Sequence, residues 1–204
     1  MKELITILGP TATGKTSLAA ALAHEIGAEI ISADSRQVYR GMDLGTGKDL
    51  DDYVVKGQPI PYHLIDIADP GEEYNVFSFQ NDFLQCFNDI HERGKRAIMC
   101  GGTGMYLESV ILAYEMKEAP RVEALRKDLE SLTDEELKNK LMSIRDVHNT
   151  SDTEDRARMI RAIEISGIRY SKSDIRSDLN EIVHHVFGIS LPREVIRERI
   201  TARL

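Results

Sequence analysis

The sequence lacks a long apolar run, a set of paired cysteines and a metal-binding spacing of histidines. No apolar run approaches the roughly 20 residues that a membrane-spanning helix needs. Cys86 and Cys100 are the only cysteines, and each falls in an apolar segment, so we expect two core residues rather than a disulfide. The six histidines have no metal-ligand spacing, which gives no reason to expect a zinc site.

The chain also lacks an excess of basic residues, since its net charge is −8. That balance argues against a general nucleic-acid binder, because phosphate backbones attract basic surfaces, and any such role would need a local basic patch. The contents of hydrophobic and charged residues, 42% and 29%, are typical of a soluble globular protein. The apolar segment at residues 1–8 is too short for a signal peptide, so we expect a cytoplasmic protein with no membrane partner.

Short apolar segments alternate with helical patterns over the first half of the chain. We expect strands at 4–8, 29–32, 62–67 and 96–100, and helices at 15–26 and from 76 to the glycine at 94. This alternation predicts right-handed crossovers and a mostly parallel sheet flanked by helices. The polar turns 9–16, 32–37 and 101–104 each follow a strand, so they should meet at one edge of the sheet.

The pattern changes after about residue 113. Residues 119–145 and 152–168 have helical stripes and no strand, whereas 184–191 is typical of a strand and 194–204 of a helix. We therefore expect three parts: an α/β core at 1–113, a helical insertion at 114–182, and a return to the core at 183–204.

The segment Gly9–Thr16 reads GPTATGKT and matches the phosphate-loop pattern G-x-x-x-x-G-K-[ST] in full, between a strand and a helix. In such a loop the backbone N–H groups and the helix N-terminus point at phosphate oxygens. Lys15 supplies a full positive charge, and the Thr16 hydroxyl is placed to meet Mg²⁺. The pattern predicts a P-loop NTPase-like α/β fold that binds a diphosphate or triphosphate, but it does not identify the reaction.

Further motifs are more specific than the phosphate loop. They are Ile30–Tyr39 (IISADSRQVY), Gly41–Lys48 (GMDLGTGK), His63–Ile67 (HLIDI), Gly101–Tyr106 (GGTGMY) and Asp155–Glu164 (DRARMIRAIE). Together with the phosphate loop, and in this order, they resemble the tRNA dimethylallyltransferase (tRNA isopentenyltransferase) family over most of the chain.

The resemblance implies transfer of a dimethylallyl group from dimethylallyl diphosphate to N6 of the tRNA adenosine just 3′ of the anticodon, with Mg²⁺ bound at Thr16. It implies catalytic roles for Asp34, which accepts the N6 proton, Thr103 and Lys15. The implied diphosphate-binding residues are Gly9, Thr11, Ala12, Thr13, Gly14, Lys15 and Thr16. The implied tRNA-binding residues are Asp34, Ser35, Arg36, Gln37, Thr103, Arg158 and Arg161.

Arg158 and Arg161 are three residues apart and so share one face of a helix, which supplies a local basic patch in an acidic chain. The sequence departs from the family at Ala157, where glutamine is usual, and at Gly47, where alanine is usual. The family's chain is a monomer and continues past the segment matching 192–204 with further tRNA contacts, so we expect part of the tRNA-binding surface to lie there.

Three other functions remain open from the sequence. A related transferase could alkylate a free adenine nucleotide instead of tRNA, as shorter members of the wider group do. A small-molecule kinase could use the same phosphate loop. A nucleotide-binding module could have lost catalysis or could act only with a partner.

Overall fold

The computed structural model describes residues 2–116, 123–144, 153, 155–166 and 175–203. The chain divides into two compact units. An α/β unit comprises Met1–Glu115 with Asp174–Leu204, and a helical unit comprises Met116–Ser173. The boundary predicted at 182 therefore falls inside the α/β unit. The reason is that Leu179 and Ile182 are buried in the core of that unit rather than against the insertion.

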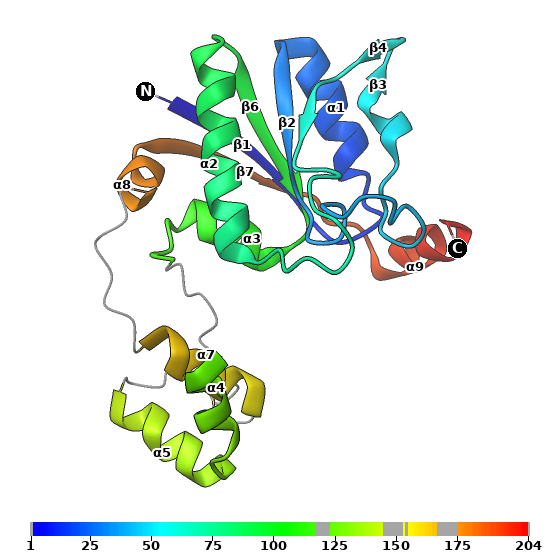
Figure 1. Cartoon of the computed structure of the whole chain (residues 1–204). Coiled ribbons are helices and arrows are strands. Elements are labelled where there is room, and N and C mark those ends of the chain that lie inside the picture. Colours follow the sequence, from blue (N-terminus) through cyan, green and yellow to red (C-terminus); the bar gives the residue numbers. More distant parts are fainter. Residues whose placement is uncertain (1, 117–122, 145–152, 154, 167–174, 204) are drawn as a thin grey trace. The chain divides into compact units, whose positions relative to one another are not determined.

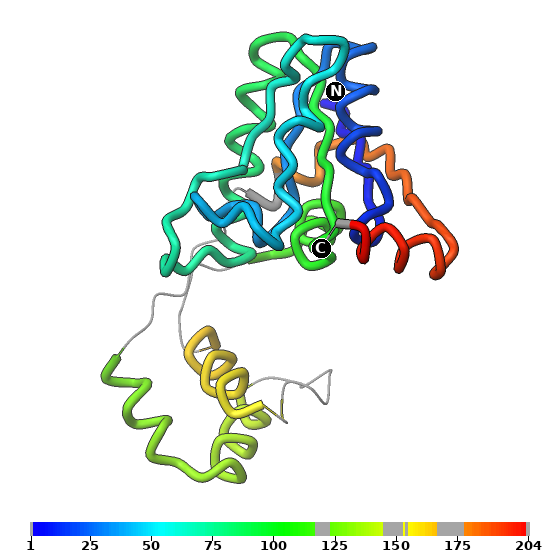
Figure 2. Tube along the Cα trace, turned by 90° about the vertical axis from the view of Figure 1, so that its right-hand side faces the viewer, coloured from blue at the N-terminus to red at the C-terminus, as the bar shows by residue number. Residues whose placement is uncertain are grey.

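A five-stranded, fully parallel sheet forms the centre of the α/β unit (Figures 1 and 2), as predicted. In spatial order the strands are β5 (Tyr62–His63), β2 (Ala28–Ala33), β6 (Arg96–Gly101), β1 (Lys2–Leu8) and β7 (Ile182–Gly188). The helices of this unit are α1 (Lys15–Ile26), α2 (Val76–Glu92), α3 (Gly104–Ile111), α8 (Ile175–Asn180) and α9 (Arg193–Arg203).

The two faces of the sheet are buried by different helices, because side chains alternate along each strand. On β6, Met99 packs into one cluster with the phenylalanine stripe of α2, whereas Ile98 packs into the other with the alanines of α1. Cys100 is buried, Cys86 is half-buried, and both thiols are free, as expected.

The strand predicted at 62–67 ends at His63. Leu64 and Asp66 take left-handed backbone angles, with φ of 62° and 55°. The segment then pairs with the chain after β2 through Ile67, whose N–H donates to Val38 O at 2.8 Å. Leu64 and Ile65 are both buried, but in opposite clusters, which is why an apolar run here imitates a strand.

Three short elements of the α/β unit have no counterpart in the sequence prediction. They are α3, the 3₁₀ turn η1 (Leu50–Tyr53), and a hairpin of β3 (Val54–Val55) and β4 (Gln58–Pro59). The hairpin lies beside α1 and seals one edge of the core with the buried Tyr53.

The helical unit contains α4 (Glu123–Glu130), α5 (Asp134–Ile144) and α7 (Arg156–Ser166), and its described residues form no strand. Thr133 and Glu136 make a reciprocal cap at the start of α5: the Thr133 N–H donates to Glu136 Oε2 at 2.8 Å, and the Glu136 N–H donates to Thr133 Oγ1 at 3.3 Å. Its core is a small apolar cluster built from all three helices. Across the described residues of both units, every helix is too short or too polar to cross a membrane.

Candidate functional site

The carboxyl ends of three neighbouring strands carry the motifs that the sequence singled out. Leu8 of β1 pairs with Gly101 of β6, and Gly101 pairs in turn with Ala33 of β2. The next residue on each strand therefore begins a loop from the same row. Because neighbouring strands lie about 4.8 Å apart, the phosphate loop and Asp34 start about 10 Å from each other. An edge of this kind is where ligands bind in parallel α/β sheets.

The phosphate loop between β1 and α1 is curled around one carbonyl. Pro10 O accepts hydrogen bonds from Thr13 Oγ1 at 2.9 Å and from Lys15 Nζ at 2.5 Å. Gly14 has φ of 84° and immediately precedes α1, so the chain reverses there to aim the first N–H groups of the helix at the loop. Ala12 also has a positive φ, 63°, which is strained for a residue with a Cβ and is typical of ligand-binding turns.

The rest of the predicted diphosphate set lies in the same curl, at the end of β1 and the start of α1: Gly9, Thr11 and Thr16. Thr11 is exposed, whereas Thr16 and Lys15 are partly buried in the first turn of α1. The seven predicted residues all lie in this one loop and in the first turn of α1.

Arg199 is a second cation at this loop, contributed from α9, far away in the sequence. Its Nη1 donates to Ala12 O at 3.4 Å. The sequence offered only a weak signal, since Arg193, Arg197, Arg199 and Arg203 all lie on this helix and spacing alone does not say which one meets the loop.

The loops after β2 and β6 are joined by hydrogen bonds. The Thr103 N–H donates to Ala33 O at 3.2 Å, and the Ser35 N–H donates back to Thr103 Oγ1 at 3.0 Å. A Cβ added at Gly101 would lie 2.2 Å from Ala33 O, so only glycine allows the two strands this approach. Asp34 and Thr103, two predicted catalytic residues, therefore lie on adjacent strand ends.

The Asp34 carboxylate is partly exposed, and its Oδ1 accepts from the Arg36 N–H at 2.9 Å, which fixes one side-chain rotamer. Burial raises the pKa of the Cys100 thiol to about 12; the Lys15 charge opposes that rise and the Asp34 charge adds to it. The charges of Lys15 and Asp34, two predicted catalytic residues, therefore both act on the thiol at the end of β6.

Gln37 is buried, and both ends of its amide are engaged. Its Oε1 accepts from Ser32 Oγ at 3.2 Å, and its Nε2 donates to Gly47 O at 3.1 Å. In this arrangement Gln37 fastens the next loop to β2, while the neighbouring Arg36 is exposed.

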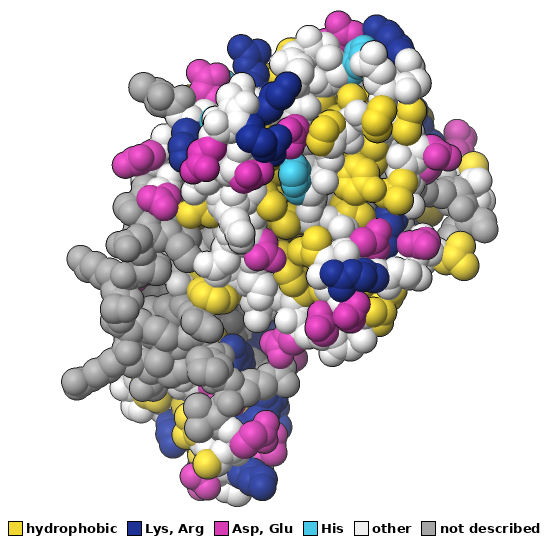
Figure 3. Space-filling model, turned by 45° about the horizontal axis from the view of Figure 1, so that its top comes forward, with side chains coloured by type: hydrophobic (Ala, Val, Ile, Leu, Met, Phe, Trp, Pro, Cys, Tyr) yellow, Lys and Arg dark blue, Asp and Glu magenta, His cyan; other side chains and the backbone are white. Residues whose placement is uncertain are grey.

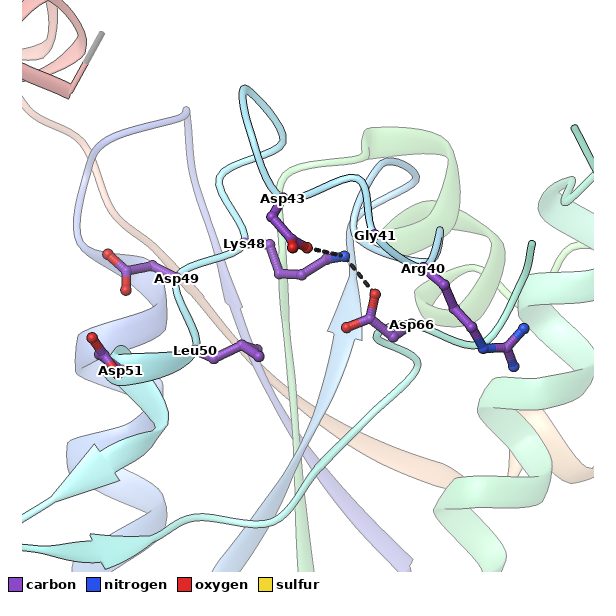
Figure 4. A pocket seen from close by; sticks show the side chains of 8 residues that line it. All are labelled: Arg40, Gly41, Asp43, Lys48, Asp49, Leu50, Asp51 and Asp66. Carbon is purple, nitrogen blue, oxygen red and sulfur yellow. Dashed lines mark hydrogen bonds and ion pairs between the residues drawn. The ribbon is translucent and has the colours of Figure 1, made fainter. Parts of the chain in front are cut away.

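Beyond Gln37, a cavity of about 600 Å³ is lined by Arg40, Gly41, Asp43, Lys48, Asp49, Leu50, Asp51 and Asp66 (Figure 4). Lys48 lies at its base, and its Nζ donates to Asp66 Oδ1 at 2.5 Å, Asp43 Oδ1 at 3.0 Å and Tyr39 O at 2.9 Å. Burial alone would lower the pKa of Lys48, but the hydrogen bonds to Asp66 and Asp43 outweigh burial and raise that pKa. Lys48, Asp43 and Asp66 belong to sequence motifs for which no individual residue role was predicted.

The predicted tRNA-contact arginines lie on α7 of the helical unit. Arg158 is exposed, and its N–H donates to Asp155 Oδ1 at 3.0 Å at the start of the helix. Arg161 is partly buried and its Nη1 donates to Glu164 Oε2 at 3.2 Å. Met159, Ile160 and Ile163 are buried on the other face, as the spacing predicted.

Comparison with known proteins assigns the family. The model described as IPP transferase matches residues 37–204, and the one described as isopentenyl transferase matches residues 2–60. This chain belongs to the IPP transferase family. The match covers the segment after Asp34, the turn at the end of β6, the helical unit and α9.

The chain is similar over its whole length to several curated and solved members. It is 52% identical over 202 residues to tRNA dimethylallyltransferase 1 of Parabacteroides distasonis, covering 99% of this chain and 66% of that protein. The identity, the aligned length and both coverages are the same for tRNA dimethylallyltransferase 2 of Phocaeicola vulgatus. The chain thus spans just under two thirds of the length of the curated relatives it matches.

Two solved structures share its fold. The full-length tRNA isopentenylpyrophosphate transferase of Bacillus halodurans superposes with a TM-score of 0.61 at 34% identity, covering 100% of this chain and 65% of that one. A eukaryotic dimethylallyltransferase acting on tRNA gives a TM-score of 0.75 at 26% identity, covering 100% of this chain and 53% of that one.

Proposed function

We propose that this chain transfers a dimethylallyl group from dimethylallyl diphosphate to N6 of the adenosine 3′ of the anticodon in tRNA, releasing diphosphate. One observation carries the proposal: the phosphate loop and Asp34 begin from the same row of the sheet, two strands apart, in a member of the IPP transferase family. That span, about 10 Å, fits a diphosphate at one end and a nucleobase amine at the other, with the reacting carbon between them.

The diphosphate end is supported by charge. Lys15 and Arg199 both contact the loop, and the N-terminus of α1 adds backbone N–H donors. As the C1–O bond of the donor breaks, negative charge grows on the departing oxygen, and these groups stabilise it where it forms. When the donor binds, Lys15 and Arg199 exchange their hydrogen bonds to Pro10 O and Ala12 O for stronger ones to phosphate oxygens.

Mg²⁺ fits this end only in combination with the donor. No group of three or more His, Cys, Asp and Glu side chains among the described residues could hold a metal ion. Thr16, in the first turn of α1, offers one hydroxyl, and phosphate oxygens of the donor together with water would supply the other oxygen ligands. When bound, the ion neutralises charge on the departing diphosphate.

The acceptor end is supported by the fixed carboxylate of Asp34. An aromatic amine is a weak nucleophile, so a carboxylate hydrogen-bonded to its N–H raises its electron density as the N6–C1 bond forms. Asp34 Oδ2 then takes the N6 proton, and diphosphate leaves with the electron pair of the broken C1–O bond. Thr103, joined to Ser35 at the next strand end, lies beside the path between donor and amine.

A second candidate acceptor is a free adenine nucleotide. The isopentenyl transferase model, which matches residues 2–60, supports it for the phosphate loop and Asp34. The longer match, residues 37–204, includes α7 with Arg158 and Arg161 and favours a large RNA acceptor.

Label transfer tests the proposal. The protein is incubated with Mg²⁺ and labelled dimethylallyl diphosphate, and in turn with tRNA, AMP or no acceptor. We expect label in tRNA only. Label in AMP would support the second candidate, and label in neither acceptor would contradict both. A parallel incubation with ATP measures phosphoryl transfer, the reaction of a kinase.

A further inference from the structure

Residues 41–47 form a closed loop next to the predicted adenosine-binding segment. Thr46 is buried, and its Oγ1 donates to Met42 O at 2.7 Å across the loop. Gly45 and Gly47 both have φ of 75°, which gives the tight return of the chain. The loop therefore has its own internal hydrogen bonds and turn geometry.

Two buried side chains fasten the base of this loop. Lys48, whose side chain is only 1% exposed, donates to the carboxylates of Asp43 and Asp66 (Figure 4). It also donates to Tyr39 O. The Nε2 of Gln37 holds Gly47 O. Burying an ammonium group costs free energy unless it is fully hydrogen-bonded, so a buried lysine with three acceptors is a strong fixing point.

The fixed loop presents an apolar side chain entirely to solvent. Leu44 is 98% exposed, whereas the other exposed large apolar side chains among the described residues are 38–60% exposed. Apolar side chains reach the surface at many places on the face drawn in Figure 3. Partly exposed apolar side chains are ordinary on protein surfaces, because the rest of each side chain is packed. Leu44 has no such packing, although the loop beneath it is built with buried polar groups.

We propose that Leu44 is a wedge that packs against the nucleobases beside the flipped-out adenosine of the RNA substrate. This inference rests on the proposed function. Leu44 lies three residues from Gly47, hence within about 11 Å of it, and Gly47 is bonded to Gln37, three residues after Asp34. Moving one base out of a stack costs a few kcal/mol, and an apolar side chain in the gap replaces part of the lost stacking.

The charges around the loop favour a base over a phosphate as the group that meets Leu44. Asp43 is neutralised by Lys48, but Lys48 is shared with Asp66. Arg40, which also lines the cavity, is paired with Asp69 at 2.8 Å, whereas Asp49 and Asp51 add negative charge. A phosphate group would be repelled here, whereas the uncharged face of a base would not.

Binding of an anticodon stem-loop RNA tests the wedge. The RNA carries 2-aminopurine at the target position, which brightens when it leaves the stack and lacks the N6 amine that reacts. We expect Leu44→Ala to weaken RNA binding by about 10-fold and to reduce the rise in fluorescence, because alanine loses most of the apolar surface that leucine would bury against the bases. Leu44→Met should retain both signals, because methionine also fills such a gap.

Val54→Ala is the matched control, since Val54 is 52% exposed on β3 of the same unit. It should bind RNA like the wild type, and none of the variants should change the affinity for dimethylallyl diphosphate. Equal RNA binding by Leu44→Ala and Val54→Ala would overturn the wedge. So would loss of self-association in Leu44→Ala with RNA binding intact, which would make the loop a contact between copies of the chain.

The two proposals fail differently. If the wild type binds the RNA and raises the fluorescence, Leu44→Ala weakens both signals, and no label is transferred, the proposed function fails and the contact of Leu44 with the RNA stands. If label transfer proceeds and Leu44→Ala matches the control in binding and fluorescence, only the wedge fails.

Discussion

The α/β unit and the helical unit are stabilised in different ways, and the difference decides what each can position. In the α/β unit, strands distant in sequence are hydrogen-bonded in register, so Leu8, Gly101 and Ala33 lie in one row. In the helical unit, three helices pack through a cluster of seven buried residues, and most of the remaining surface is charged. A register of strands fixes reacting groups relative to each other, whereas short helices provide a surface for contact.

The largest expected effect is on the α/β side, where the chemistry is proposed. Asp34→Ala should reduce the rate of prenyl transfer by about 10³-fold, because general base catalysis contributes about 10²–10⁴-fold. Binding of dimethylallyl diphosphate, measured by calorimetry, should not change. Asp51→Ala, an exposed aspartate of the same unit, is the control. Near-normal turnover in Asp34→Ala would remove the assigned role.

The next effect separates the stabilities of the two units. Leu137 is fully buried in the helical cluster, so Leu137→Ala should destabilise that unit by about 3 kcal/mol. Circular dichroism should show a helical transition at lower temperature, while dimethylallyl diphosphate binding by the α/β unit persists. Met142→Ala on the same helix, at a side chain that is 59% exposed, should leave the melting curve unchanged. Joint loss of binding and helix in Leu137→Ala would mean that the units fold as one.

A smaller effect concerns the surface of the helical unit. If Arg158 and Arg161 contact RNA phosphates, each alanine variant should lower tRNA affinity by about 5-fold and reduce the salt dependence by about one phosphate contact. Arg158→Ala should be the clearer variant, because Arg161 is also bonded to Glu164. Lys138→Ala on α5 is the control. Affinity that is independent of salt in the wild type would contradict phosphate contacts.

The smallest effect is a structural ion pair at the other end of the sheet. Glu29 is buried and accepts hydrogen bonds from Arg93 and His63, and the Arg93 bonds are the main cause of its lowered pKa. A lowered carboxyl pKa stabilises the fold at pH values above the ordinary 4.5, and this contribution is lost as pH falls through the folded-state value.

Glu29→Gln should therefore lower the melting temperature by roughly 5 °C at pH 7, and the difference should shrink as pH falls below 4.5. Scanning calorimetry at several pH values measures this. Glu25→Gln, which breaks an exposed pair with Lys56, should have little effect. A difference for Glu29→Gln that does not depend on pH would point to packing instead.

The sequence predicted the fold where the signal was local. The helix predicted at 15–26 has these bounds in the structure, because its apolar periodicity stops at Gly27. The strands around Ile30 and Ile98 were predicted to within two residues, because each is a short apolar run. The motifs at 9–16, 32–37 and 101–104 begin at neighbouring strand ends, as expected for polar turns that follow parallel strands.

What the sequence did not predict depends on contacts between distant segments. The bend after His63 accompanies left-handed backbone angles at Leu64 and Asp66 and the hydrogen bond from the Ile67 N–H to Val38 O, a contact with a distant segment. The buried Lys48 is one of many lysines until its three acceptors are in place, and Arg199 is one of several arginines on α9. Neither pattern nor spacing identifies which of several equivalent side chains the fold brings to a loop.

Leu8, Gly101 and Ala33 form a row whose spacing is fixed by the hydrogen bonds of the sheet. Under the proposed function this row sets the separation of the diphosphate end and the acceptor end at two strand widths, whatever the length of the loops that follow. Insertions or deletions between residues 40 and 60 would change the surface around the cavity shown in Figure 4 and leave that separation unchanged. Changes in this segment can therefore alter which acceptor is bound, while the sheet keeps the spacing of the two ends constant.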